Sequence, residues 1–193
     1  REGGALVMVG GRLSFGAGGY DGTELAEILP IDLDVPDFSN DALDTGTYKP
    51  VLTEAGRTHT ATQLSYAPNE NEVIWGSLPP LEGVNRNRGL QPGAMALCEH
   101  PTLKTANGKL MPVIAVAEPG KGRSAAVLTD SLWRWKLPHV GQGGDGSNYD
   151  RFWGNLIRWL IKDPELDLLR IQPSTGICAL GDSVDLEVRV FRP

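Results

Sequence analysis

Runs of apolar residues bounded by turn-forming residues mark the strands of this chain. Each run is apolar throughout and is flanked by Gly, Pro or Lys, which is typical of strands buried on both faces of a parallel sheet. The four runs that predict strands are Ala5–Val9 (ALVMV), Ala94–Cys98 (AMALC), Pro112–Ala117 (PVIAVA) and Ser124–Thr129 (SAAVLT).

Two segments carry apolar residues at helical spacing. Thr23–Leu29 has one apolar face, a threonine that can cap it and Pro30 behind it, so it predicts a short helix. Asn148–Lys162 repeats apolar residues at i, i+3, i+4, i+7 and i+8 and predicts a longer amphipathic helix. Ser147 and Asp150 form a variant of the capping box before it. Its apolar face is made by Tyr149, Phe152, Trp153, Leu156, Ile157 and Leu160.

The pattern is weaker elsewhere and changes after Pro164. Asp32–Tyr48 is acidic and poor in aliphatic residues, which predicts an exposed excursion, and Tyr48–Leu64 predicts an edge segment followed by a stretch of weak periodicity. After Pro164 apolar and polar residues alternate, which predicts antiparallel strands with one buried face. We therefore expect an α/β domain over residues 1–164 and a β segment over 165–193, the opening of a β-sandwich domain.

Composition excludes several classes of partner. The 193 residues are 40% hydrophobic and carry a net charge of −6, with Lys and Arg scattered along the chain. Such a chain has no basic surface for nucleic acid or an anionic membrane, and no apolar run reaches the roughly 20 residues that span a bilayer. Because it begins with Arg1 at a buried-looking strand, we expect a soluble piece of a longer polypeptide whose compartment the sequence does not reveal.

The cysteines and histidines give no recognisable catalytic or metal site. Cys98 and Cys178 lie far apart in the sequence and have no Cys or His neighbours at metal-ligand spacing. We interpret both as small buried hydrophobic residues and prefer this to a disulfide or a reactive thiol. His59, His100 and His139 stand in unrelated contexts, so none is assigned as a base. We predict no metal, no cofactor and no catalytic residue.

The glycine-rich loop after the first strand raises the question of a ligand site. Gly10–Tyr20 lacks the third glycine of the dinucleotide fingerprint, and the chain has no Walker A motif. Ser14 is not framed as a nucleophile elbow. Two interpretations stay open: the backbone binds an anion near Arg12, or the glycines only allow sharp turns.

A second distinctive stretch is GKGRSAAVLTDSLWRW, from Gly120 to Trp135. It places Asp130, Ser131 and two tryptophans at the carboxyl end of a buried strand, the edge where open α/β sheets bind ligands. Trp133 and Trp135 alternate, so a continued strand would point both the same way, toward a ligand or a partner, or into the core.

Four segments together resemble the glutamine amidotransferase-like domain of bacterial proteins, within the class I glutamine amidotransferase-like group. The resemblance runs over most of residues 3–160. It is carried by GGALVMVGGRLSFGAGGYDGTELAEILP, by WGSLPPLEGVNR with LQPGAMAL, by GKGRSAAVLTDSLWRW and by YDRFWGNLIRWL.

The resemblance implies a flavodoxin-like three-layer α/β sandwich with a mostly parallel sheet, whose first strands would precede Arg1. It also implies a larger, membrane-anchored bacterial protein that can carry von Willebrand factor A-like and immunoglobulin-like parts, which the alternating tail would suit. Class I amidotransferases use a Cys at the elbow after a strand, with a His and a Glu after a later strand. Here Gly10 and Gly11 stand at the first place, and Asp130 and Ser131 near the second, so we expect the triad to be missing.

We therefore expect a catalytically degenerate domain that binds a small ligand or a protein, with Gly10 near Asp130 in space. Two alternatives are a hydrolase using Asp130, Ser131 or Ser14, and a structural spacer. Asp130 could equally hold the Gly10–Gly11 turn by a hydrogen bond to its backbone. The candidate ligand-binding residues are Gly10, Gly11, Arg12, Ser14, Phe15, Asp130, Ser131 and Trp133.

Overall fold

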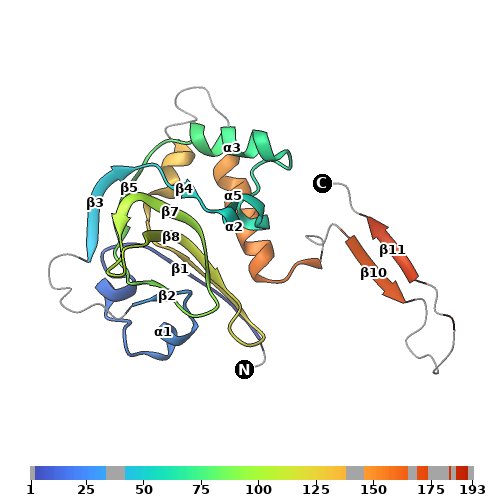
Figure 1. Ribbon diagram of the computed structural model, residues 1–193, viewed down its shortest axis with the longest axis horizontal. Coiled ribbons are helices and arrows are strands. Elements are labelled where there is room, and N and C mark those ends of the chain that lie inside the picture. Colours follow the sequence, from blue (N-terminus) through green and yellow to red (C-terminus); the bar gives the residue numbers. More distant parts are fainter. Residues whose placement is uncertain are drawn as a thin grey trace. The chain divides into compact units, whose positions relative to one another are not determined.

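A computed structural model describes residues 3–33, 42–137, 146–164, 169–173, 183 and 186–190 of the chain. It divides into two compact units, Arg1–Ile161 and Lys162–Pro193. Within the described residues, the first unit holds a five-stranded sheet and four α-helices (Figure 1). The first unit is thus an α/β fold.

The central sheet has the strand order β1-β9-β8-β7-β4. Its strands are β1 (Ala5–Val9), β9 (Arg123–Val127), β8 (Leu110–Ala117), β7 (Met95–Lys104) and β4 (Val51–Leu52). The four predicted apolar runs therefore do form strands. Only β1 and β9 run parallel, however, while β9–β8, β8–β7 and β7–β4 pair antiparallel.

The prediction of a mostly parallel sheet is wrong. Residues 105–109 join β7 to β8 and residues 118–122 join β8 to β9. Connections this short make hairpins, because a parallel crossover needs a dozen or more residues. The strands are apolar on both faces for a different reason: elements pack on both sides of the sheet.

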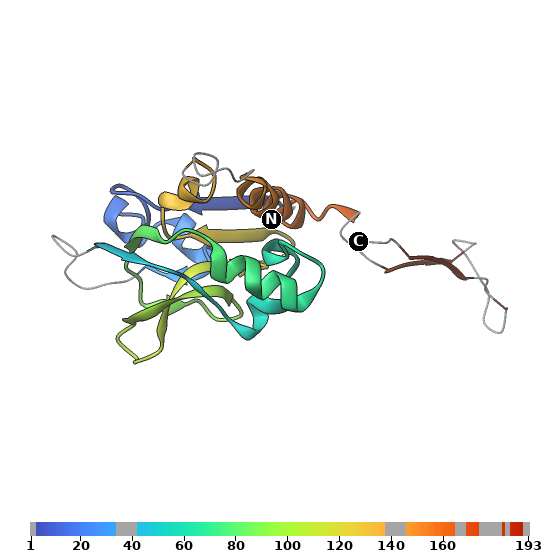
Figure 2. The same ribbon diagram turned by 90° about the horizontal axis from the view of Figure 1, so that it is seen from above.

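Helices cover one face of the sheet (Figures 1 and 2). They pack around a cluster of aromatic side chains. The cluster joins Trp75 of α3 (Pro68–Ser77), Trp135 of the 3₁₀ helix η3 (Ser131–Trp135) and Phe152 of α5 (Ser147–Leu160), with ring centroids 5.4–6.5 Å apart. The short α2 (Glu54–Thr58) and η2 (Thr60–Thr62) occupy the stretch whose periodicity was too weak to interpret.

The predicted long helix is confirmed as α5, but its cap is not the predicted one. Gly146 is the N-cap, with φ of 66°, and no side chain caps the helix. Ser147 is already helical, and Asp150 pairs with Lys136 at 2.6 Å instead of closing a capping box. Of the predicted apolar face, Phe152, Leu156 and Leu160 are buried, whereas Ile157 is 49% exposed.

Smaller elements lie on the side of the sheet opposite α5 (Figure 1). The predicted first helix is confirmed as α1 (Glu24–Ile28), after the 3₁₀ turn η1 (Phe15–Gly18). Two antiparallel pairs follow. One is β2 (Ile31–Asp32) with β6 (Gly89–Leu90). The other is β3 (Leu43–Tyr48) with β5 (Leu81–Asn85), which lies instead at the carboxyl end of β9, where the backbone amide of Asn85 donates to the carbonyl of Leu128. Within the excursion predicted over 32–48, residues 43–48 form a strand, of which residues 45–47 are exposed as expected, and residues 34–41 lie outside the described residues.

The described residues of the second unit form an antiparallel pair, β10 (Leu169–Pro173) with β11 (Leu186–Val190). Alternation of apolar and polar residues predicted strands of this kind. Whether residues 165–193 begin an immunoglobulin-like domain stays a prediction.

Candidate functional site at the carboxyl ends of β1 and β9

Gly10, directly after β1, lies against the peptide bond between Leu128 and Thr129, just after β9. Its amide donates a 2.7 Å hydrogen bond to the carbonyl of Val127, and a Cβ at Gly10 would lie 2.5 Å from the backbone nitrogen of Thr129. No side chain fits at that distance, so only glycine allows the two segments to approach. Because Asp130 follows Thr129, the structure brings the two predicted segments together at neighbouring strand ends.

Asn85, at the end of β5, holds the turn of the loop. Its Oδ1 accepts from the amide of Gly11 at 2.9 Å, and its Nδ2 donates to the carbonyl of the same residue at 2.9 Å. The backbone amide of Asn85 donates to the carbonyl of Leu128 at 2.7 Å. This one buried residue therefore connects the loop to the end of β9. The bond expected from Asp130 to this turn is made by Asn85, and Asp130 is exposed.

The side chain of Phe15 anchors the loop in the core. It is completely buried and has φ of 56°, in the left-handed region that non-glycine residues rarely adopt. Arg12 and Leu13 are exposed to solvent, and Ser14 is half-buried. Phe15, a predicted ligand contact, is thus a core residue, and Arg12 is the charged group that the loop presents.

The segment after β9 is also divided between surface and core. Ser131 is 4% exposed: its Oγ accepts from the amide of Glu82 at 2.9 Å and lies 2.8 Å from Oγ1 of Thr129. Ser131 therefore fastens η3 to β5, while Asp130 beside it reaches the surface.

The two tryptophans of this segment do not point the same way. Trp133 is 47% exposed and Trp135 is buried, with its indole N–H donating to the carbonyl of Pro79 at 3.1 Å. The segment is a 3₁₀ helix and not a continued strand, and residues two apart in a 3₁₀ helix face different directions. Trp133 alone is available to a ligand.

Cys98 lies away from this site, in β7, and is completely buried. Burial raises the pKa of its thiol, so the thiolate needed for nucleophilic attack is disfavoured. Its interpretation as a small buried hydrophobic residue is confirmed, and Cys178 lies outside the described residues.

The described histidines are structural. Nδ1 of His100 accepts from the amides of Thr102 and Leu103, and its ring packs on Tyr48 with centroids 4.3 Å apart. Burial lowers the pKa of His100. Burial, reinforced by the positive charge of Arg123, lowers the pKa of His59 to about 4.

The site therefore consists of two segments, Gly10–Phe15 and Asp130–Trp133, which we call the carboxyl-end site. Neither segment contains a cysteine or a histidine. Among the residues that the structure describes, no group of three His, Cys, Asp or Glu side chains could hold a metal ion. At its surface the site offers the cation of Arg12, the carboxylate of Asp130 and the indole of Trp133.

A comparison of the chain with models of protein families gives a match over most of its length. The model of the GATase1_like family, described as "Putative glutamine amidotransferase", matches residues 1–162. The chain belongs to this family. The resemblance inferred from the four sequence segments is thereby confirmed, and the first unit is a glutamine amidotransferase-like domain.

Two solved structures resemble this amidotransferase-like chain. The cytoplasmic protein STM1381 from Salmonella typhimurium LT2 is 27% identical, with a TM-score of 0.58 over 82% of this chain and 56% of its own. The cytoplasmic protein STM3548 from Salmonella typhimurium is 18% identical, with a TM-score of 0.56 over 82% and 55% of the two chains, and shares the fold.

The amidotransferase-like chain thus spans little more than half the length of these two proteins. A comparison with curated proteins gives no match. In the part of the chain that the structure describes, no helix has both the length and the apolar character needed to cross a membrane.

Proposed function

We propose that this amidotransferase-like domain binds a small polar ligand or a protein through the carboxyl-end site and does not hydrolyse glutamine. The observation that carries the proposal is the packing of Gly10. At the place where the resemblance puts the nucleophilic Cys, a Cβ would lie only 2.5 Å from the backbone nitrogen of Thr129. A thiol there would require the ends of β1 and β9 to separate.

The charged and aromatic groups of the site support binding. Arg12, Asp130 and Trp133 reach the surface from segments whose backbones are fixed by Asn85 and by Thr129. A cation, a carboxylate and an exposed indole on rigid supports suit a ligand with polar groups and a flat surface. Aromatic and Arg side chains are also enriched at protein interfaces.

A hydrolase based on Ser131 is less well supported. Its hydroxyl is buried and engaged with the Glu82 amide and with Thr129. Ser131 is therefore occupied in holding η3, although Ser14 and Asp130 remain accessible to a ligand. Membership of a larger, membrane-anchored bacterial protein stays a prediction of the resemblance.

Glutamate release by the full-length gene product tests the enzymatic half of the proposal. We expect no turnover of glutamine above the buffer blank. Turnover that is abolished by Cys98→Ala would contradict the proposal and assign the nucleophile to β7.

Thermal-shift screening of polar metabolites tests the binding half. We expect at least one compound class to raise the Tm of the wild-type chain, and Arg12→Ala and Asp130→Asn to remove that shift. Lys109→Ala, an exposed residue in the turn between β7 and β8, serves as the control and should keep it. If no compound and no co-purified protein distinguishes these variants, the domain is a structural spacer.

A further inference from the structure

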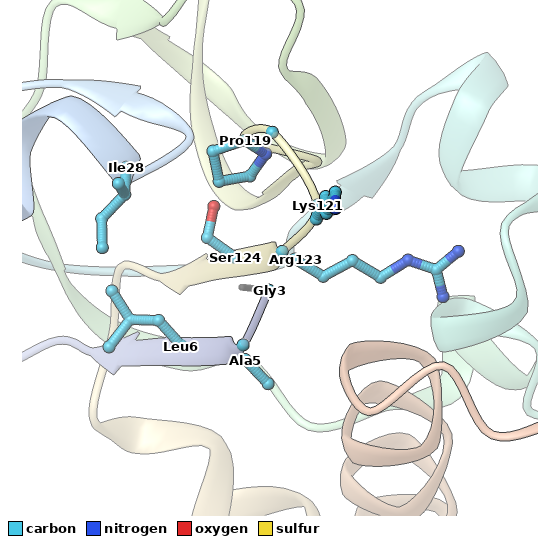
Figure 3. A pocket seen from close by; sticks show the side chains of 11 residues that line it. Gly3, Ala5, Leu6, Ile28, Pro119, Lys121, Arg123 and Ser124 are labelled. Atoms are coloured by element: carbon cyan, nitrogen blue, oxygen red, sulfur yellow. The ribbon is translucent and has the colours of Figure 1, made fainter. Parts of the chain in front are cut away.

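Cavities lie at both edges of the central sheet. The larger has a volume of about 690 Å³ and adjoins the edge strand β1, with walls formed by Leu6, Ile28 and Pro119 and with Ser124 directed between them (Figure 3). The resemblance implies strands that precede Arg1, and these strands and their connections are the expected neighbours of this cavity. A ligand site is better sought at the other edge.

The smaller cavity lies beside β4, the edge strand opposite β1, and has a volume of about 340 Å³. Strand β4, the two residues before it, α2 and α3 supply its walls. Sites for small molecules have volumes of about 300–1,000 Å³. A cavity at the lower end of that range holds one small ligand and has no room for a long peptide.

Charged side chains of both signs line this cavity. Arg57 of α2 and Glu72 of α3 form an ion pair there, with 54% and 51% of their side chains exposed. An ion pair between two exposed side chains contributes little to stability, so a ligand can replace either partner at low cost. Lys49 adds a second cation, since its Nζ donates to the carbonyl of Gly76 in the last turn of α3 at 2.9 Å. The cavity therefore offers two cations and one carboxylate.

An apolar surface lies next to these charges. Val51 of β4 is 49% exposed, although it is an aliphatic residue. The indole of Trp75 is fixed in place, because its N–H donates to the carbonyl of Thr62 at 2.9 Å. Both residues line the cavity, together with Pro50 and Leu52. One ligand can thus bury an apolar group and meet charged groups at the same time.

The backbone of β4 adds a hydrogen-bond donor and an acceptor. The amide of Thr53 donates to the carbonyl of Leu97 at 3.1 Å, and Val51 pairs with Glu99, so the peptide groups of residues 51 and 53 face β7. Alternation along the strand turns the amide and the carbonyl of Leu52 away from β7, to the open side of the edge. These groups suit a ligand that itself carries donors and acceptors.

We propose that the cavity beside β4 binds a free α-amino acid with an apolar side chain. The carboxylate of the ligand pairs with Arg57, its ammonium group pairs with Glu72, and its side chain packs on Val51 and Trp75. Lys49 stays on the end of α3 and adds to the positive potential. One bound zwitterion then replaces a single ion pair by two.

The charges of the cavity favour a zwitterion over a ligand with one charge. A plain carboxylate would meet the like charge of Glu72, and a plain amine would meet the like charges of Arg57 and Lys49. The exposed Val51 favours an aliphatic side chain, because its burial removes apolar surface from water. An aliphatic amino acid satisfies all three conditions.

Isothermal titration calorimetry of the full-length gene product tests the site with leucine and two analogues. Isocaproate lacks the amino group of leucine, and isoamylamine lacks its carboxylate. We expect both analogues to bind at least about tenfold more weakly than leucine, because each loses one charge-assisted pair. Glycine should also bind more weakly, since it has no side chain for the apolar wall. Equal affinities for these compounds, or no binding of leucine, would overturn the proposal.

Substitutions of the two paired charges separate recognition from a loss of folding. Arg57→Gln should weaken leucine at least about tenfold and leave isoamylamine unchanged or tighter, whereas Glu72→Gln should weaken leucine and tighten isocaproate. Lys109→Gln, in the turn between β7 and β8, is the control and should change none of the three affinities. Variants that weaken all three compounds alike, or that leave leucine unaffected, would contradict the assigned contacts.

The cavity beside β4 shares no residue with the carboxyl-end site. Failure of leucine to bind would therefore leave the proposal for the carboxyl-end site as it stands. Likewise, a carboxyl-end site without a ligand would not affect the binding of leucine beside β4.

Discussion

Gly10 determines how closely the ends of β1 and β9 approach each other. Gly10→Ala places a methyl group 2.5 Å from the backbone nitrogen of Thr129, and a backbone cannot move aside as a flexible side chain would. We expect a loss of about 3 kcal/mol in the free energy of unfolding, measured by urea denaturation.

Gly154→Ala is the matched control for this change. Gly154 lies within α5, and a Cβ there would meet nothing within 4 Å. Alanine should therefore stabilise the helix by about 1 kcal/mol. Equal effects of the two substitutions would contradict the close packing at Gly10.

His59 makes the stability of the fold depend on pH. Its pKa falls from 6.5 to about 4 on folding because the ring is buried, so the unfolded chain binds a proton that the folded chain does not. The contribution of neutral His59 to the free energy of unfolding is therefore fully present above pH 6.5. It is lost as the pH falls toward 4, by on the order of 2 kcal/mol.

His59→Asn isolates this contribution. Nδ1 of His59 accepts from the amide of Ala61 and caps η2, and an asparagine oxygen can accept the same bond. Urea denaturation at pH 7.5 and at pH 5 should give a smaller difference for the variant than for the wild type. An unchanged difference would assign the pH dependence to other groups, among them His100.

At the scale of elements, Asn85 couples β5 to the loop after β1. Asn85→Ala leaves the amide of Gly11 without a partner, at a cost of about 1–3 kcal/mol, and leaves the carbonyl of Gly11 with only the amide of Ser14, which donates to it at 3.4 Å. We expect lower stability and an amide of Gly11 that exchanges at least tenfold faster, measured by NMR. The control is Asn148→Ala, at a half-buried asparagine in the first turn of α5, which should change neither the stability nor the exchange of the Gly11 amide. A Gly11 amide that still exchanges slowly in the Asn85 variant would mean that the loop keeps its conformation without Asn85.

The positions of the elements could be predicted from sequence, but the pairing of the strands could not be read from apolar runs alone. Such runs report burial on two faces, which antiparallel strands under helices share with parallel ones. The short connection between Ala117 and Ser124 did contain the missing information, since it cannot hold a crossover.

The site could be predicted only in part for a related reason. Gly10 and Asp130 follow apolar strands, so their meeting at one sheet edge was open to prediction from the sequence. Asn85 is 74 residues from the glycine that it binds, and nothing in the local sequence distinguishes it from an exposed turn residue. Likewise, Phe15 and Ser131 lie in polar or glycine-rich contexts, and only the tertiary fold buries them.

For the molecule as a whole, the topology of the sheet implies an order of folding. β7, β8 and β9 follow one another along the chain through short turns, whereas β1 must wait for β9, with residue 5 pairing with residue 123. Closing so long a loop is entropically slower than forming hairpins. In pulse-labelled refolding, we expect amides of β7 and β8 to be protected before those of Leu6 and Met8, and the reverse order would contradict this sequence of events. The carboxyl-end site would then be among the last features to appear, so a ligand bound there would report on chains that have finished folding.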